Sequence, residues 1–557
     1  MEPSFGVTLS SNATTFACFA PHAYRVEVRI FKQGENEIFP LTCHPSGVWS
    51  VTIEKNYVSY GYFFRVWAPE CQELVDPYAV QLDPSIGCGK IVDLQPLPKD
   101  GFQTPSMADL VISEVHARDI LAYTKTSKNL SIFAQLQQFF EQPNTFSDLG
   151  VNAIEWMPWM EFDTNSMHAY HWGYMPAHFF APSSTYGTPQ ELQRLIQTLH
   201  AHGFAVIMDV VYNHAGKKND LLRWSERECF RHDASGKRTN DSGCGNDIRT
   251  EHPMIQRLII DSLRHWIQTY QVDGFRFDLA ELLGLECLRT IEKELRLIKP
   301  DVILIAEPWS FRGHIAQALK GSSYACWNDG MREFLWRYVQ GQGSCEELLY
   351  FLAGSTGAFG ATAQQSINYT ESHDDYAWVD RLDGEGEAIR RKTHMMFAIL
   401  LLSLGIPMLA EGQDFLRSKQ HVRNTYCRGD LNFLNYEQLQ AHASTHAYVR
   451  SLIQLRASQW GQLLKIAKPT PGYFRPFYAE NSSALCVCWN ADGSCGESQL
   501  LLALNPHHVS VRFHFHDFPT EAFRAIADTD AFPPKTPLHL SKTWALDPLS
   551  CALFIRP

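Results

Sequence analysis

The stretch from about residue 105 to 464 repeatedly alternates short apolar runs with longer amphipathic segments. The runs are aliphatic and β-branched, as in FAVIMDVV (204–211), and such runs are typical of strands buried on both faces of a parallel sheet. The segments between them place apolar residues three and four positions apart, which predicts helices that cover the sheet. The predicted strands are 111–115, 153–157, 204–211, 274–279, 302–307, 366–370, 406–411 and a weaker one at 323–327. Eight strand-helix units predict an α/β fold, a closed (β/α)₈ TIM barrel.

Both ends of the chain have a different pattern, with strand signals and little helical periodicity. The first hundred residues contain FACFAP from Phe16 and VEVRIF from Val26, and the last hundred contain LCVCW and VSVRFHF. Alternation of apolar and polar residues in these runs predicts a β-sandwich at each end. We therefore expect an N-terminal β-sandwich at 1–104, a barrel at 105–464 with a short third loop at 215–250, and a C-terminal β-sandwich at 465–557.

The charge balance argues against polyanionic partners. The 557 residues carry 48 Lys and Arg against 60 Asp and Glu, a formal charge of −12, with no cluster of basic residues. Neither a nucleic acid nor an anionic membrane is expected as partner. The longest apolar run, 395–410, is interrupted and too short to span a bilayer.

The fourteen cysteines are scattered along the sequence. None of the fourteen forms a CxxC pair, and Cys486 and Cys488 alternate along a predicted strand. Buried free thiols are the expected state. Because the N-terminal sequence has no basic segment followed by an apolar stretch, we expect a cytoplasmic location.

Three acidic residues follow the ends of three predicted barrel strands: Asp278, Glu307 and Asp374. Strand carboxyl ends meet at the mouth where such barrels place their active sites. Taken singly, each acid is better explained as a solvated strand end or a helix cap. Together they indicate glycosidic bond cleavage, which needs one carboxylate as nucleophile and one protonated carboxyl as acid.

Neighbouring residues suggest a role for each acid. Arg276 precedes Asp278 by two positions on a strand, so both side chains share a face and the cation would keep Asp278 ionised as a nucleophile. Glu307 is followed by Pro308 and Trp309, and apolar surroundings would raise its pKa as a general acid requires.

Four stretches resemble the signature regions of the α-amylase superfamily of glycoside hydrolases, in order along the chain: DVVYNH (209–214), GFRFD (274–278), AEPW (306–309) and ESHD (371–374). The resemblance implies a retaining mechanism with Asp278 as nucleophile, Glu307 as acid and base, and Asp374 as transition-state stabiliser. It also implies that the substrate is bound by Tyr174, Asp209, His214, Arg276, His373 and Trp309.

Other stretches are similar to particular members of that superfamily. The N-terminal region, with FAPHA (19–23) and DPYA (76–79), resembles the module that precedes the barrel in isoamylases, pullulanases, branching enzymes and trehalohydrolases. The segment 279–281 lacks the Lys-His pair usual in α-amylases. Residues 414–419 and 424–430 resemble debranching enzymes of the isoamylase and pullulanase types. We therefore expect hydrolysis of α-1,6-glucosidic branch linkages in glycogen or maltodextrin-type α-glucans.

Several alternatives stay open at this point. FFAP (179–182) and YGTP (186–189) are similar to branching enzymes and trehalohydrolases, so a branching transglycosidase or an α-1,4-glucan or trehalohydrolase-type hydrolase is a second hypothesis. An inactive glucan-binding protein is a third, although all three acids are present. Asp375 stands where debranching enzymes often have Asn. Asn213 occupies a calcium-binding position of α-amylases, but we expect no metal and no cofactor. The oligomeric state is not predicted.

Overall fold

The computed structural model describes residues 4–124, 129–163 and 170–557. The chain divides into two compact units. One contains residues 1–103, 126–141 and 156–315, and the other contains residues 104–125, 142–155 and 316–557.

Eight parallel strands close into a barrel in chain order, as the alternating pattern predicts. They are β10 (Ile112–Val115), β11 (Ala153–Trp156), β12 (Ala205–Val210), β13 (Gly274–Phe277), β14 (Ile303–Ala306), β17 (Tyr324–Trp327), β18 (Ser366–Asn368) and β19 (Ile406–Ala410). The weak strand expected at 323–327 is therefore present. Every residue of these strands is buried, which explains why the runs are continuously apolar rather than alternating.

In the first unit, amphipathic helices follow the barrel strands: α1 (Ile132–Phe140), α3 (Pro189–Ala201), α6 (Pro253–Tyr270) and α8 (Leu285–Arg296). Helix α3 begins at a capping box in which Thr188 and Glu191 satisfy each other's backbone N–H groups, with Pro189 in the first turn. Short helices α4 (Leu221–Trp224), α5 (Glu226–Cys229) and α7 (Ala280–Leu283) lie in the loops.

The second unit contains α2 (Thr145–Leu149), α9 (Asp329–Tyr338), α10 (Cys345–Leu352), α11 (Glu387–Leu402), α12 (Gly429–Asn432), α13 (Glu437–Ala441) and α14 (Ala443–Ala457). In α11 every residue from 392 to 402 is buried, so the longest apolar run of the sequence is a core helix and its continuation. No helix within the described ranges has the length and apolarity needed to cross a bilayer.

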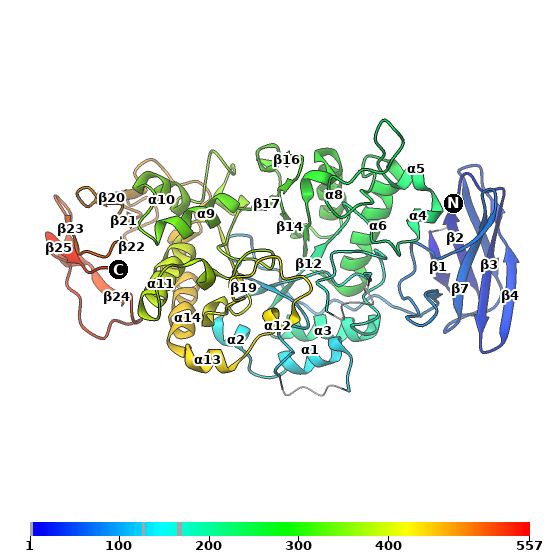
Figure 1. The fold of residues 1–557 in the computed structure, drawn as a ribbon, viewed down its shortest axis with the longest axis horizontal. Coiled ribbons are helices and arrows are strands. Elements are labelled where there is room, and N and C mark those ends of the chain that lie inside the picture. Colours follow the sequence, from blue (N-terminus) through cyan, green and yellow to red (C-terminus); the bar gives the residue numbers. More distant parts are fainter. Residues whose placement is uncertain (1–3, 125–128, 164–169) are drawn as a thin grey trace. The chain divides into compact units, whose positions relative to one another are not determined.

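Two antiparallel sheets form the N-terminal sandwich. One has the order β1 (Gly6–Leu9), β2 (Thr14–Phe19), β6 (Val48–Ile53) and β5 (Thr42–Cys43). The other has the order β4 (Glu35–Pro40), β3 (Arg25–Lys32), β7 (Gly61–Trp67) and β8 (Cys71–Leu74), with β9 (Gly89–Lys90) on β7. Figure 1 shows β4, β3 and β7 side by side in blue. Phe16, Val28 and Phe64 are fully buried in the core of this sandwich.

The C-terminal region also consists of two sheets. The larger has the order β20 (Phe474–Tyr478), β21 (Leu485–Trp489), β22 (Gln499–Asn505), β26 (Ser550–Arg556) and β24 (Arg524–Asp528), and β23 (Val511–His514) pairs with β25 (Thr543–Leu546). Phe513 and Phe515 point into the core, as their alternation predicts, together with the free thiols of Cys486 and Cys488. The predicted barrel flanked by two β-sandwiches is thus confirmed, while the boundaries at 104 and 464 stay predictions.

Candidate active site

Asp209 and Arg276 face each other on neighbouring barrel strands. They are paired positions in the parallel register of β12 and β13. The Arg276 Nη1 atom lies 2.9 and 2.8 Å from the two carboxylate oxygens of Asp209, and both side chains are buried. The strand register alone therefore places this ion pair.

Asp278 comes directly after β13 and shares the face of Arg276, as predicted. Its Oδ1 atom lies 3.1 Å from Arg276 Nη1. The side-chain amide of Asn213 donates to Asp278 twice, to the main-chain oxygen at 2.7 Å and to Oδ2 at 2.8 Å. Both carboxylate oxygens thus have a fixed partner, so the orientation of this carboxylate is set before any ligand binds.

Glu307 follows β14, and its carboxylate is held by the same guanidinium. The Oε2 atom lies 3.0 Å from Arg276 Nη2 and accepts the backbone N–H of Leu279 at 2.7 Å. Leu279 adopts φ 40°, a left-handed conformation that is costly for a non-glycine residue and that occurs at functional sites. The expectation of purely apolar surroundings for Glu307 is therefore wrong, because a cation lies within bonding distance.

Arg276 is the single cation at the centre of this cluster, and its side chain has no exposed surface. Burial would lower its pKa, but the charges of Asp209, Glu307 and Asp278 outweigh burial and raise the pKa well above the ordinary value. Burial raises the pKa of Asp209 to about 6, against the effect of Arg276. Three acids around one cation leave an excess of negative potential, which favours a developing positive charge.

Tyr174 and His214 complete this group. The Tyr174 hydroxyl donates to Asp209 Oδ2 at 2.6 Å, and its ring centre lies 5.9 Å from the Arg276 guanidinium carbon. The His214 Nε2 atom lies 2.7 Å from the main-chain oxygen of Tyr174, while Nδ1 contacts the side-chain oxygen of Asn213. Burial lowers the pKa of His214. Tyr174 is only half-buried, so one part of its ring can meet a ligand.

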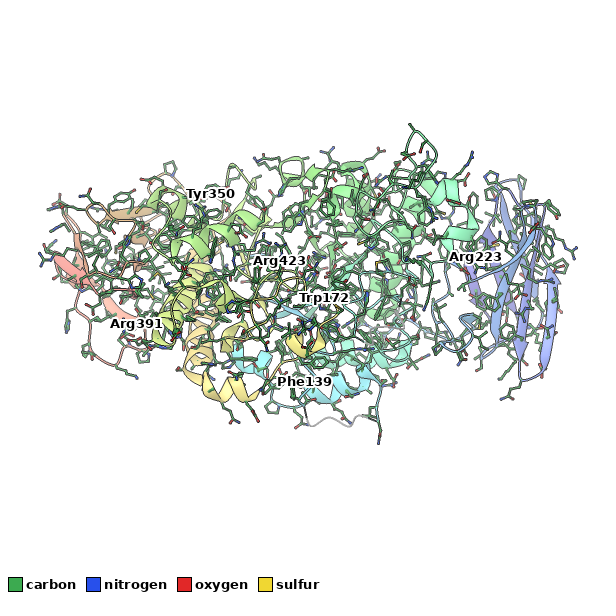
Figure 2. All side chains as sticks on the ribbon, in the orientation of Figure 1. Phe139, Trp172, Arg223, Tyr350, Arg391 and Arg423 are labelled. Carbon is green, nitrogen blue, oxygen red and sulfur yellow. The ribbon has the colours of Figure 1, made fainter. Side chains whose placement is uncertain are left out.

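The turn before Tyr174 depends on a glycine. Gly173 has φ 97°, and a Cβ atom there would lie 2.8 Å from the main-chain oxygen of Pro158. Trp172, labelled in Figure 2, is buried and donates its indole N–H to the Tyr170 hydroxyl at 3.2 Å. Trp156 is also buried, and its ring packs against Phe140.

Trp309 opens a short hairpin formed by β15 (Trp309–Ser310) and β16 (Gly313–His314). Its ring is half-buried and lies 6.2 Å from the ring of His314. At the hairpin tip, the Phe311 side chain is 84% exposed. Arg312 next to it binds Glu281 at 3.2 Å. Glu281 thus braces this hairpin in the segment where α-amylases usually carry a Lys-His pair.

His373 and Asp374 follow β18 and belong to the second unit. Glu114, a buried residue of β10, accepts the backbone N–H of His373 at 2.9 Å and lies 2.6 Å from its Nδ1 atom. The Asp374 side chain is 57% exposed, and its Oδ1 atom lies 3.5 Å from His373 Nε2. His373 is therefore held from the barrel interior, while the Asp374 carboxylate stays available to a ligand.

The structure thus brings five of the predicted residues together with a sixth, Arg276: Tyr174, Asp209, His214, Asp278 and Glu307. His373 and Asp374 lie beyond the carboxyl end of another strand of the same barrel. Two residues that position the site were not predicted, Asn213 and Glu114. Asn213 drew attention only as a calcium-type position, and its amide is bonded to Asp278 and His214. Glu114 has a weak signal, an acid within a short strand that also contains Ile112 and Val115.

Comparison with family models matches residues 4–79 to carbohydrate-binding module 48, the isoamylase N-terminal domain, and residues 135–243 to the alpha amylase catalytic domain. A pullulanase from Bacillus subtilis (strain 168) is 31% identical over 516 residues, which cover 82% of this chain and 71% of the relative. A glycogen debranching enzyme from Escherichia fergusonii is 26% identical, with 91% of this chain and 92% of the relative covered.

A solved structure agrees with the sequence relatives. The crystal structure of pullulanase type I from Bacillus subtilis str. 168 complexed with maltose has a TM-score of 0.91 and 25% sequence identity. The match covers 100% of this chain and 86% of that chain. The similarity therefore includes both flanking sandwiches as well as the barrel.

Proposed function

Because the chain belongs to the pullulanase and isoamylase group of debranching glycoside hydrolases in the α-amylase superfamily, we propose that it hydrolyses α-1,6-glucosidic branch linkages in glycogen or maltodextrin-type α-glucans. The observation that carries the proposal is the Arg276 cluster. One buried guanidinium binds Asp209, Asp278 and Glu307 at 2.8 to 3.1 Å. This is the charge arrangement that an oxocarbenium-like transition state requires.

In the first step, Asp278 attacks the anomeric carbon while Glu307 gives its proton to the oxygen that leaves with the main chain. The bond from carbon to that oxygen breaks as the bond to Asp278 forms. In the second step, Glu307 takes a proton from water, and the water oxygen displaces Asp278. Two carboxylates that share one guanidinium lie close together, which supports retention because retaining enzymes need about 5–5.5 Å between them.

The other predicted residues bind the sugar. We assign Tyr174 to stacking on the ring at the cleavage point and Asp209, His214 and Arg276 to its hydroxyl groups. The position of Asp374 beyond a barrel strand and its exposure support a role as transition-state stabiliser, with His373 beside it. Trp309 would contact the chain on the leaving side. A maltose complex of the structural relative supports an α-glucan as ligand.

The free thiols support a cytoplasmic location. In the part of the chain that the structure describes, none of the fourteen cysteines is assigned to a disulfide, as is usual in a reducing compartment. We propose that location for this reason.

Incubation of the purified chain with pullulan, glycogen and unbranched amylose tests the proposed function. We expect new reducing ends from pullulan, linear chains from glycogen and no shortening of amylose. Shortened amylose would indicate an α-1,4 hydrolase, and new branches without matching reducing ends would indicate a branching transglycosidase. No reaction with any of the three would favour an inactive glucan-binding protein.

A further inference from the structure

The segment 372–375, which carries Asp374, is held through all four of its main-chain oxygens by one other segment. The Lys419 ammonium group donates to the carbonyl oxygens of Ser372 at 3.3 Å, His373 at 2.8 Å and Asp375 at 3.1 Å. The fourth oxygen, that of Asp374, accepts the backbone N–H of Asn424 at 3.0 Å. No side chain of the 419–424 segment binds the Asp374 carboxylate in the described contacts, so the hold is on the backbone alone.

Lys419 is a buried residue whose ammonium group donates all three of its hydrogens. The residue is 1% exposed, and its three ammonium hydrogens match the three carbonyl partners. Burying an ammonium group costs free energy unless its hydrogens are bonded. The carbonyl oxygens of 372–375 supply these bonds and so offset the cost of burying Lys419. The three carbonyl partners all lie within the four residues 372–375, so one ammonium group fixes the backbone on both sides of Asp374.

The segment that carries Lys419 is itself fastened to Asp380. The Asp380 carboxylate accepts the Ser418 hydroxyl at 2.6 Å and the Lys419 backbone N–H at 2.7 Å. His421 Nδ1 lies 2.7 Å from the main-chain oxygen of Asp380. Gln420, His421 and Asn424 all have φ between 50° and 59°, left-handed values that only a well-fixed loop tolerates in non-glycine residues. We call residues 418–424 the clamp.

We propose that Lys419 is a positioning residue: through the clamp it sets the place of the Asp374 carboxylate in the debranching reaction. This inference rests on the proposed function, in which Asp374 acts on the transition state. It also gives a structural role to the two sequence stretches that resemble debranching enzymes, since Lys419 ends the first stretch and Asn424 begins the second. The exposed Asp374 side chain has few fixed partners of its own, so its position depends on its backbone.

The first test compares Lys419→Met with Lys392→Met. Lys392 is also a buried lysine, and its ammonium group donates to one carbonyl, that of Asp383, at 2.8 Å. We expect Lys419→Met to lower kcat on pullulan about 100-fold with KM within about threefold, since small misplacement of a catalytic group has effects of this size. Lys392→Met should keep kcat. Equal losses in both variants would overturn the proposal.

A double-mutant cycle with Asp374→Ala separates positioning from general damage. If Lys419 acts through Asp374, adding Lys419→Met to Asp374→Ala should lower kcat less than about threefold further. A full additional 100-fold loss would contradict the proposal.

Ethylammonium added to Lys419→Ala should restore part of kcat and leave Lys419→Met unchanged, because only the alanine variant leaves room for the amine.

Hydrogen exchange gives a readout that does not depend on activity. Amides of 371–381 should exchange at least about tenfold faster in Lys419→Met than in Lys392→Met. Should Lys419→Met fail to fold, Ser418→Ala loosens the clamp from an exposed position and should show a smaller increase. Unchanged exchange of these amides in Lys419→Met would overturn the clamp. If exchange is faster in Lys419→Met but the unmodified chain does not hydrolyse pullulan, only the proposed function is overturned.

Discussion

Asn213 donates two hydrogen bonds to Asp278, at 2.7 Å to its main-chain oxygen and at 2.8 Å to Oδ2. One amide group therefore fixes both the backbone and the carboxylate of the proposed nucleophile. The other side of the carboxylate is bonded to Arg276. A neutral donor in this place orients Asp278 without adding charge.

Replacement of Asn213 by Asp tests this relationship. The new carboxylate would repel the negative charge of Asp278, which must be ionised to attack. We expect kcat/KM on pullulan to fall at least about 100-fold and the acidic limb of its pH profile to move about one unit upward. Asn213→Ala, which adds no charge, should lose activity with little movement of that limb. An unmoved limb in Asn213→Asp would refute the argument.

Glu307→Gln and Asp278→Ala should both be inactive on pullulan but should behave differently on a substrate whose leaving group needs no proton. Both should lower turnover of pullulan by several orders of magnitude, because each side chain acts in the transition state. On α-maltotriosyl fluoride the leaving fluoride needs no proton, so Glu307→Gln should form the covalent intermediate and release fluoride in a burst. Asp278→Ala should release none. A burst in Asp278→Ala would remove it from the role of nucleophile.

The barrel was predictable because its strands are buried on both faces and read as apolar runs. Even the weak strand at 323–327 is present, as β17. The N-terminal region was less readable. The runs from Phe16 and Val26 became β2 and β3, whereas β4 was missed because its residues alternate between exposed and half-buried and carry little apolar signal.

Those site residues could be predicted whose side chains lie on a barrel strand or just after its carboxyl end. Asp278, Glu307 and their partner Arg276 all lie within a few residues of β13 or β14. Asn213 and Glu114 could not be assigned from sequence because their partners are 65 and 259 residues away. For the same reason the pairing of Glu307 with Arg276 was missed, and the local neighbours Pro308 and Trp309 suggested the wrong surroundings.

Gly274→Ala should destabilise the barrel at the strand that carries Arg276. A Cβ atom on Gly274 would lie 2.4 Å from both the Cβ and the main-chain oxygen of Ile303 on the neighbouring strand. Backbone in the centre of a closed sheet cannot move away, so we expect a loss of about 3 kcal/mol in the free energy of unfolding. Thermal unfolding compared with Gly313→Ala, where the added atom meets nothing, provides the control. Equal melting temperatures would contradict the prediction.

His200 bridges two carboxylates at the amino-terminal side of β12 and β13. Its Nδ1 atom lies 2.6 Å from Asp100 and its Nε2 atom 2.9 Å from Asp273, and its ring stacks on Phe102 at 4.3 Å. Burial would lower the pKa of His200, but the hydrogen bonds and charges of Asp273 and Asp100 outweigh burial and raise it. The histidine therefore ties the segment around residue 100 to the barrel most strongly when it is protonated.

Stability should consequently depend on pH through His200. Because its folded pKa lies above the unfolded value of about 6.5, the added stability is fully present below that value and is lost as the pH rises through the folded pKa. His200→Gln should lower the free energy of unfolding by about 1–3 kcal/mol at pH 6, since it leaves buried acceptors unpaired, and by less at pH 9. Thermal melts across this range measure the difference, with His202→Gln on the exposed end of the same helix as control. A difference that grows with pH would contradict the raised pKa.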